Sequence, residues 1–300
     1  TTQLTAVSAA KVTAMTETQT AALTTTQIAS LSTTQVRAFS DANLSALDAA
    51  QSAALTGAQI ASLTNTQIAN LSATDVADLT TTQIAAMATT QVRALTETTL
   101  GDLSDTQVAA FTATQIANLS ATNVGLLAET QAAALTATQV GALTTTQIKA
   151  LSETNLAALS TAQVAAINAT QIKALTNTQI EALGAADVAE FTATQLEALS
   201  TTQMTALNAT NMASLSAAQV AAFGASQIAR LGTEALSALD ATQMGALTAT
   251  QVKALTATQI GALESTDVAE ITATQIAALS KTQVAALNET SLAGLTATQV

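Results

Sequence analysis

The sequence of 300 residues contains no His, Cys, Trp, Tyr or Pro, and only four Phe. Without His or Cys, the chain lacks a general base that ordinarily titrates near pH 7, a thiolate nucleophile and a soft metal ligand. A globular enzyme of this length also needs aromatic residues to fill its core, and they make up 1% of this chain. We therefore expect that the protein is not an enzyme, and we expect no catalytic, cofactor-binding or metal-binding residues.

Charge is sparse as well. Charged residues make up 9% of the chain and the net charge is −12. The acidic pI, near 4.1, and the scattered basic residues disfavour nucleic acid as a partner. Much of the hydrophobic content is Ala, and Thr, Ser or Gln interrupts every apolar run before it reaches the length of a membrane span. The sequence therefore predicts no membrane insertion.

What the sequence does contain is one octapeptide, repeated without insertion from Ser8 to the end. We number its positions one to eight, so that TTTQIASL at 24–31 begins at position one. Position one is Ser, Thr, Asp, Asn or Gly except at Ala88, Ala128 and Glu264, and position four is Gln at 27 of 38 sites. Position five is usually aliphatic, and position eight is Leu at 28 of 37 sites. Ser or Thr followed three residues later by Gln is a capping box, which starts a helix.

Each repeat therefore predicts a helix of about two turns, which the next cap interrupts. One continuous helix is excluded, because eight residues at about 100° each leave a remainder of about 80°, and the apolar stripe would rotate away. The charges agree with this boundary: 14 of 20 acidic residues lie at positions one to four, and six of eight basic residues lie at positions six or seven. This polarity matches the dipoles of short helices.

A β-solenoid is the alternative fold, since strings such as T-T-T-Q-I are also compatible with strands. Positions five and eight would then point to opposite faces of one strand, which weakens this alternative. Abundant Ala with only ten Gly also suits helices better than tight β-corners.

A second, longer period appears where position four is not Gln. After Lys11, the replacements are separated by three or four octapeptides, and their nine intervals average about 3.4 octapeptides (31/9). They are Asn43, Asp75, Thr99, Asn123, Asn155, Asp187, Asn211, Ala235, Asp267 and Ser291. The basic residues follow nearly the same interval. We therefore predict an all-α solenoid with about 3.4 short helices per superhelical turn.

In this solenoid, positions five and eight share one helical face that points to the axis, and Ala at positions six and seven lets neighbouring turns approach closely. We expect residues 1–300 to form a single continuous solenoid, a rod that is a segment of a longer chain. Uncharged stretches such as 49–74, 106–128 and 198–229 suggest a face of Thr, Gln, Ser, Asn and Ala. This face is where we expect self-association or lateral packing.

Two features invite a functional interpretation. Acidic pairs three residues apart, such as Asp75/Asp78, Asp102/Asp105, Asp187/Glu190 and Asp267/Glu270, could form a weak Ca²⁺ site, but a solvated face explains them better. The recurrent T-x-T motif resembles the Thr ladders on the ice-binding faces of some antifreeze proteins. A binding module for ice or a polysaccharide is therefore the alternative to a structural role.

Motifs such as L-T-A-T-Q-I-G-A-L at 255–263 also give the whole chain a resemblance to the Ala/Thr/Gln-rich repeat tracts of giant bacterial secreted or cell-surface proteins, including adhesin stalks and extracellular fibres. The resemblance implies an acidic structural protein that is extracellular or at the cell surface, and it carries over no functional residues. We expect a structural repeat rod in an extracellular filament or in the stalk of a surface protein.

Overall fold

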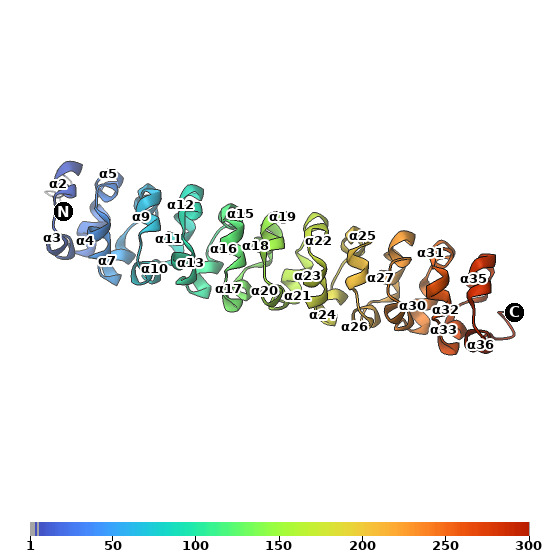
Figure 1. Ribbon diagram of the computed structural model, residues 1–300. Helices are drawn as coiled ribbons and strands as arrows, with labels where there is room; N and C mark the ends of the chain where they lie inside the picture. The colour runs from blue at the N-terminus through green and yellow to red at the C-terminus, as the bar shows by residue number, and fades with distance from the viewer. Residues whose placement is uncertain (1–3, 5, 300) are drawn as a thin grey trace. The chain divides into compact units, whose positions relative to one another are not determined.

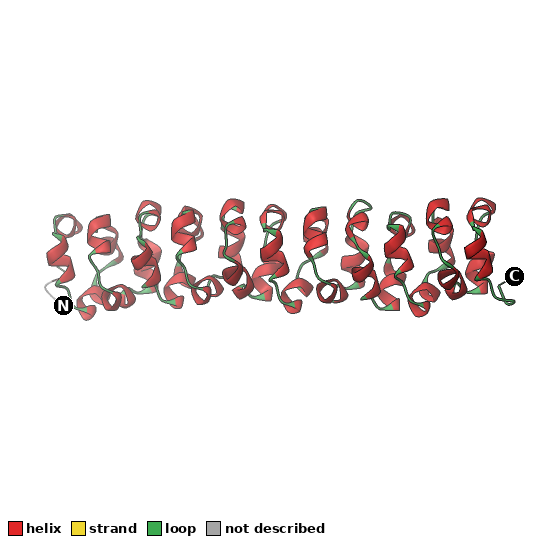
Figure 2. Cartoon of the chain, turned by 60° about the horizontal axis from the view of Figure 1, so that its bottom comes forward, coloured by secondary structure: helices red, strands yellow, loops and turns green. Residues whose placement is uncertain are grey.

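The computed structural model describes residue 4 and residues 6–299. The chain divides into two compact units, residues 1–158 and 159–300, which we describe separately. Within each unit, short helices follow one another as successive turns of a coil (Figure 1). The described residues contain no β-strand (Figure 2), so the β-solenoid alternative is wrong and the predicted all-α solenoid is confirmed.

The helices of the first unit are five or six residues long. They are α2 (Ala9–Thr13), α3 (Glu17–Ala21), α4 (Thr25–Ser30), α5 (Thr33–Arg37), α6 (Asp41–Ser45), α7 (Ala49–Ala54), α8 (Gly57–Ser62), α9 (Asn65–Ala69), α10 (Ala73–Ala77), α11 (Thr81–Ala86), α12 (Thr89–Ala94), α13 (Glu97–Gly101), α14 (Asp105–Ala109), α15 (Ala113–Asn118), α16 (Ala121–Gly125), α17 (Glu129–Ala134), α18 (Ala137–Ala142), α19 (Thr145–Ala150) and α20 (Glu153–Ala157).

The helices of the second unit are four to six residues long, and one of them, η1, is a 3₁₀-helix. They are α21 (Thr161–Ala165), α22 (Ala169–Ala174), α23 (Asn177–Ala182), α24 (Ala185–Ala189), α25 (Ala193–Ala198), η1 (Gln203–Ala206), α26 (Ala209–Ala213), α27 (Ala217–Ala222), α28 (Ala225–Ile228), α29 (Thr233–Ser237), α30 (Ala241–Ala246), α31 (Ala249–Ala254), α32 (Ala257–Gly261), α33 (Ser265–Glu270), α34 (Ala273–Ala277), α35 (Lys281–Ala286) and α36 (Glu289–Ala293).

The predicted capping box starts most of these helices, and α15 illustrates it. The hydroxyl of Thr112 accepts a hydrogen bond from the backbone N–H of Gln115 at 3.2 Å, and Oε1 of Gln115 accepts one from the N–H of Thr112 at 2.7 Å. Two N–H groups that a helix start leaves without partners are thereby satisfied. Before α12, Ala88 has no side-chain oxygen, and only the bond from its N–H to Gln91 remains.

The helices end earlier than we predicted. Position eight lies outside the helix in an extended conformation, as at Leu119, with φ −60° and ψ 151°. The expectation that positions five and eight share one helical face is therefore wrong. Both positions are nevertheless buried, because the extended junction turns the position-eight side chain back to the interior: Ile116 is 1% and Leu119 is 5% exposed.

These two positions build the core of each unit. All four Phe occupy position eight and are buried, two in each unit: Phe39, Phe111, Phe191 and Phe223. Burying one such side chain contributes about 1.5–3 kcal/mol. Ordering the backbone of eight residues costs about 8–16 kcal/mol, so a repeat depends on its neighbours in the adjacent turns.

Successive turns pack helix on helix with a fixed offset. In the first unit, α15 packs against α12 and α18, each three helices away along the chain. In the second unit, α30 packs against α27 and α33 in the same way. A turn therefore holds slightly more than three helices.

A small residue at position six, such as Gly125, allows the close approach of turns that we predicted. A Cβ atom built on Gly125 would lie 2.7 Å from the carbonyl oxygen of Ala150, which occupies position seven of α19. Such a distance is shorter than any ordinary contact of a Cβ atom, so only Gly fits at residue 125 without displacing α19.

Candidate functional site

The most regular polar feature of the interior is the side-chain amide at position four. Nε2 of Gln91 donates to the carbonyl oxygens of Ile60 at 2.7 Å and Leu63 at 2.9 Å, both in the preceding superhelical turn. Its Oε1 meanwhile accepts the capping bond from Ala88. One side chain, 1% exposed, therefore starts its own helix and fastens it to the end of a helix in the turn before.

The bond to the position-eight carbonyl always spans 28 residues, which is 3.5 repeats (28/8) and close to the predicted 3.4. In the first unit the Gln donors of this bond are residues 35, 51, 59, 67, 83, 91, 107, 115, 131, 139 and 147. In the second unit they include residues 195, 203, 219, 227, 243, 251, 259, 275, 283 and 299. We call these bonds the glutamine ladder.

The glutamine ladder was not predicted from the sequence, because the capping box already explained Gln. A signal was nevertheless present. Glu also completes a capping box, and the chain has 20 acidic residues, yet no position four is Glu. Only an amide accepts the capping bond and donates to a carbonyl at the same time. The exclusion of Glu therefore indicates that a donor is needed at this position.

The shorter residues at position four weaken the ladder without breaking its register. Five of them donate to the same position-eight carbonyl of the preceding turn and make no second inter-turn bond, because their side chains are shorter than that of Gln. They are Asn43, Asn123, Asn155, Asn211 and Ser291. Thr99 bonds to Thr96 instead, and Ala235 has no polar side chain.

The acidic residues at position four are not on a solvated face, which corrects our expectation for Asp75 and Asp267. Their side chains are 8% and 6% exposed, while Asp187 is half-buried. Each accepts the capping N–H of its own repeat. Burial raises the pKa of Asp187 above its ordinary value, and the hydrogen bond from the Gly184 N–H lowers it less strongly.

The other acidic residues of the proposed pairs lie at or near the surface. Asp102, Asp105 and Glu190 are exposed, and Asp78 and Glu270 are half-buried. Burial, followed by the nearby Asp267 and Asp240 carboxylates, raises the pKa of Glu270. The described residues bring no three acidic side chains together in a group that could hold a metal ion. The absence of a metal site stays a prediction.

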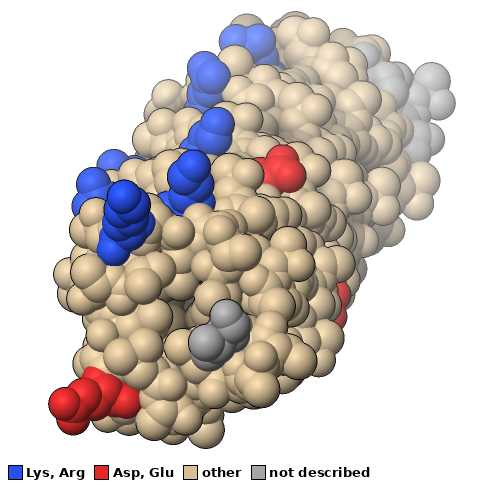
Figure 3. Space-filling view, turned by 90° about the vertical axis from the view of Figure 1, so that its right-hand side faces the viewer, with Lys and Arg blue, Asp and Glu red and all other residues tan. Residues whose placement is uncertain are grey.

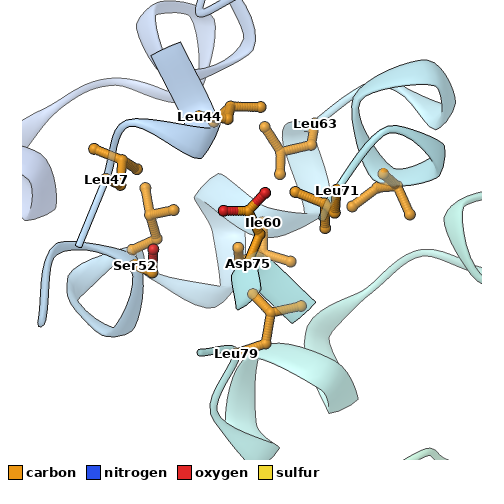
Figure 4. Close-up of a pocket in the computed structure, with 10 residues that line it drawn as sticks. Leu44, Leu47, Ser52, Ile60, Leu63, Leu71, Asp75 and Leu79 are labelled. Atoms are coloured by element: carbon orange, nitrogen blue, oxygen red, sulfur yellow. The ribbon is translucent and has the colours of Figure 1, made fainter. Parts of the chain in front are cut away.

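A small cavity interrupts the core of the first unit. Its volume is about 20 Å³, enough for one water molecule. Ser52 stands there at position five, where most repeats place Ile or Val, and the carboxylate of Asp75 points into the space between Leu44, Leu47 and Leu63 (Figure 4). This cavity is too small for a substrate.

The surface of each unit differs from the face that we predicted. Position four is buried or half-buried wherever Gln joins the ladder, so these Gln side chains are not part of an outer face. Positions one to three, as at 80–82, are exposed instead. The uncharged stretch 49–74 is almost as long as one 28-residue turn, so it forms a band around the unit rather than a face. In the C-terminal unit, nearest the viewer in Figure 3, Lys and Arg side chains gather on one flank.

In most T-x-T motifs, the hydroxyl of the first Thr already accepts a hydrogen bond within its own helix start, so only the second Thr can present an unoccupied hydroxyl to a ligand. The position-one hydroxyl, as in Thr112 or Thr248, accepts the N–H at position four of its own helix. The position-three residue Thr114 is exposed. Since these residues sit at helix starts and not on a flat β-face, the geometry gives the ice-binding alternative no support.

The part of the chain that the structure describes contains no helix that is long and apolar enough to cross a membrane.

Comparison with known families gives one match. A family described as the ALTTAQ repeat matches residues 153–185, about a tenth of the chain. Within that range, residues 158–163 read A-L-S-T-A-Q, from position seven of one repeat to position four of the next. No curated protein matches the chain. The matched segment is therefore similar to a recognised repeat, in agreement with the octapeptide array described above.

Proposed function

We propose that the chain is a structural spacer: a repeat rod in an extracellular filament or in the stalk of a bacterial surface protein. The observation that carries the proposal is the uniform glutamine ladder, since one pair of inter-turn bonds recurs along each unit. An array joined in this way grows by adding turns, and its cross-section stays constant. The resemblance to secreted repeat tracts supports the extracellular location.

The test uses a deletion that respects both periods of the sequence. Removing residues 57–112 takes out seven octapeptides, which together make two 28-residue turns. Electron microscopy of the purified parent chain should show uniform rods, on the order of 100 Å long if both units form one solenoid. The deletion variant should remain helical and its rods should be about 20 Å shorter, since one turn adds about one helix diameter.

A matched control removes residues 57–84, a single 28-residue turn whose deletion splits a repeat in half. This variant joins position one to position six, so it removes a helix at the junction and leaves the next ladder donors, such as Gln91, without a position-eight carbonyl 28 residues earlier. Its first unit should therefore unfold at a lower urea concentration than that of the 57–112 deletion. Compact particles whose length does not change with the 57–112 deletion would refute the spacer role.

We extend the proposal to lateral packing of rods through the exposed, uncharged residues at positions one to three. Thr82 and Thr114 are exposed position-three residues on neighbouring turns of the first unit. Replacing both by Glu adds negative charge to a chain whose net charge is already −12, so repulsion between rods should reduce association in sedimentation at low salt. Association that is unchanged in this variant would show that the contact lies elsewhere.

A further inference from the structure

Asn211 shows what a short side chain at position four can do. Its Oδ1 accepts the capping N–H of Asn208 at 3.2 Å, while its Nδ2 donates to the carbonyl oxygen of Leu183, 28 residues earlier, at 3.3 Å. Aspartate has the same size and shape as asparagine. In an aspartate at this position, one carboxylate oxygen therefore accepts the capping N–H. The other oxygen takes the place of the amide nitrogen that donates to the carbonyl of the preceding turn.

Three aspartates occupy this position with the same capping bond. Oδ2 of Asp187 accepts the N–H of Gly184 at 3.0 Å, and Oδ2 of Asp267 accepts that of Glu264 at 2.9 Å. Oδ2 of Asp75 accepts the N–H of Ser72 and also the hydroxyl of Ser45, at 2.8 Å each. The other oxygen of each carboxylate is not used by the cap. In the ladder, its partner would be the position-eight carbonyl oxygen 28 residues earlier: Leu159 for Asp187, Leu239 for Asp267 and Leu47 for Asp75.

We propose that Asp187 is a proton-dependent donor of the ladder, so that acid tightens the array at this point. With a proton taken up from solvent, Oδ1–H of the carboxyl donates to the carbonyl of the preceding turn, as Nδ2 of Asn211 does. Without the proton, two oxygen acceptors face each other and the bond is absent. No other bond changes.

The helices packed against the three aspartates carry no cation that would hold the carboxylates ionised. They are α13 against α10, α21 and α26 against α24, and α30 and α36 against α33, and none contains Lys or Arg. The same holds for α6, which provides Ser45, and for α7, which provides Ser52. The titratable groups on these helices or at their ends are acidic: Asp41, Asp48, Asp78, Glu97, Asp102, Glu190, Asp240, Glu264, Glu270 and Glu289.

Asp187 is the best site for a test. At Asp75, the cavity has room for a water molecule that can donate to the carboxylate and to the Ser52 hydroxyl (Figure 4). Asp187 does not line this cavity, and burial already disfavours its charge. A raised pKa in the folded state means that stability is gained as pH falls through that pKa and is lost as pH rises.

The experiment compares the parent chain with Asp187→Asn by hydrogen exchange at pH 7 and pH 4, using protection factors that are corrected for the intrinsic effect of pH. At pH 7, the amides of α21 and α24 should be about fivefold more protected in the variant, because Asn donates at every pH and one hydrogen bond is gained. At pH 4, the protonated aspartate donates too, so the difference should shrink.

The control is Glu181→Gln, an exposed site on the preceding helix α23 that undergoes the same change of charge. It should not reproduce the pH-dependent difference. A difference between the parent and Asp187→Asn that is equal at both pH values, or that the control reproduces, would overturn the proposal. Failure of Asp187→Asn to fold would also contradict it, since Asn211 already occupies the equivalent position in α26.

Discussion

Gln91 donates its side-chain amide to the carbonyl oxygen of Leu63, 28 residues earlier, at a distance of 2.9 Å. The extended backbone at position eight makes this carbonyl available, because the helix has ended and the carbonyl has no partner within it. The residue that starts one helix therefore satisfies the end of another. This reciprocity explains why an array of very short helices places Gln in most repeats.

Two glycines at position six should respond to Ala in opposite directions. In Gly125→Ala, the new Cβ meets the Ala150 carbonyl oxygen at 2.7 Å, and the forced displacement should destabilise the first unit by about 1–3 kcal/mol. Gly101 has no atom within 4 Å of such a Cβ, so Gly101→Ala should stabilise its helix by up to about 1 kcal/mol. Urea unfolding followed by circular dichroism measures both. A shift of the same sign in the two variants would contradict this explanation.

A missing cap can be restored. Ala88 begins α12 without a side-chain acceptor, although Gln91 still accepts its N–H. The N–H of Gln91 donates instead to the Ala88 carbonyl oxygen at 2.9 Å, so Ala88→Ser, which adds a side-chain acceptor, should raise stability by about 0.5 kcal/mol, the low end for a helix cap. The matched variant Ser104→Ala removes such an acceptor from α14 and should lower stability by a similar amount. Thermal melts of the two variants test this prediction, which fails if Ala88→Ser is neutral.

Glu270 should make the second unit sensitive to pH. Burial and the neighbouring Asp267 and Asp240 raise its pKa in the folded state, so folding favours its protonated form and stability rises as pH falls through that pKa. Glu270→Gln removes the charge. It should be more stable than the parent at pH 7, and the two melting temperatures should converge towards pH 4. A difference between the two melting temperatures that grows as pH falls would contradict the predicted direction of the pKa shift.

Much of the fold could be predicted from local sequence, because its determinants are local. The cap at position one, the Gln at position four and the apolar residues at positions five and eight recur in each repeat, and their spacing is enough to predict short helices. The number of repeats in one superhelical turn could also be estimated, because the residues that replace Gln, such as Asn123 and Asn155, recur at about that interval.

The inter-turn role of Gln could not be predicted by the same reasoning. The local capping bond already accounted for the side chain, and the second set of bonds joins residues that are 28 positions apart. Asp75 was misplaced for the same reason. Its charge predicted an exposed side chain. The capping bond at the helix start instead turns position four towards the interior, and there Ser72 and Ser45 donate hydrogen bonds to the Asp75 carboxylate.

The most direct test of the glutamine ladder is the pair of isosteric variants Gln91→Glu and Gln19→Glu at pH 7. Both retain the capping oxygen, and Gln19 is exposed and makes no inter-turn bond among the described residues. Gln91→Glu loses two inter-turn bonds and buries a carboxylate against two carbonyls, so it should lose at least about 2–3 kcal/mol of unfolding free energy in urea, while Gln19→Glu stays within about 0.5 kcal/mol of the parent. Equal stability of the two variants would contradict the ladder.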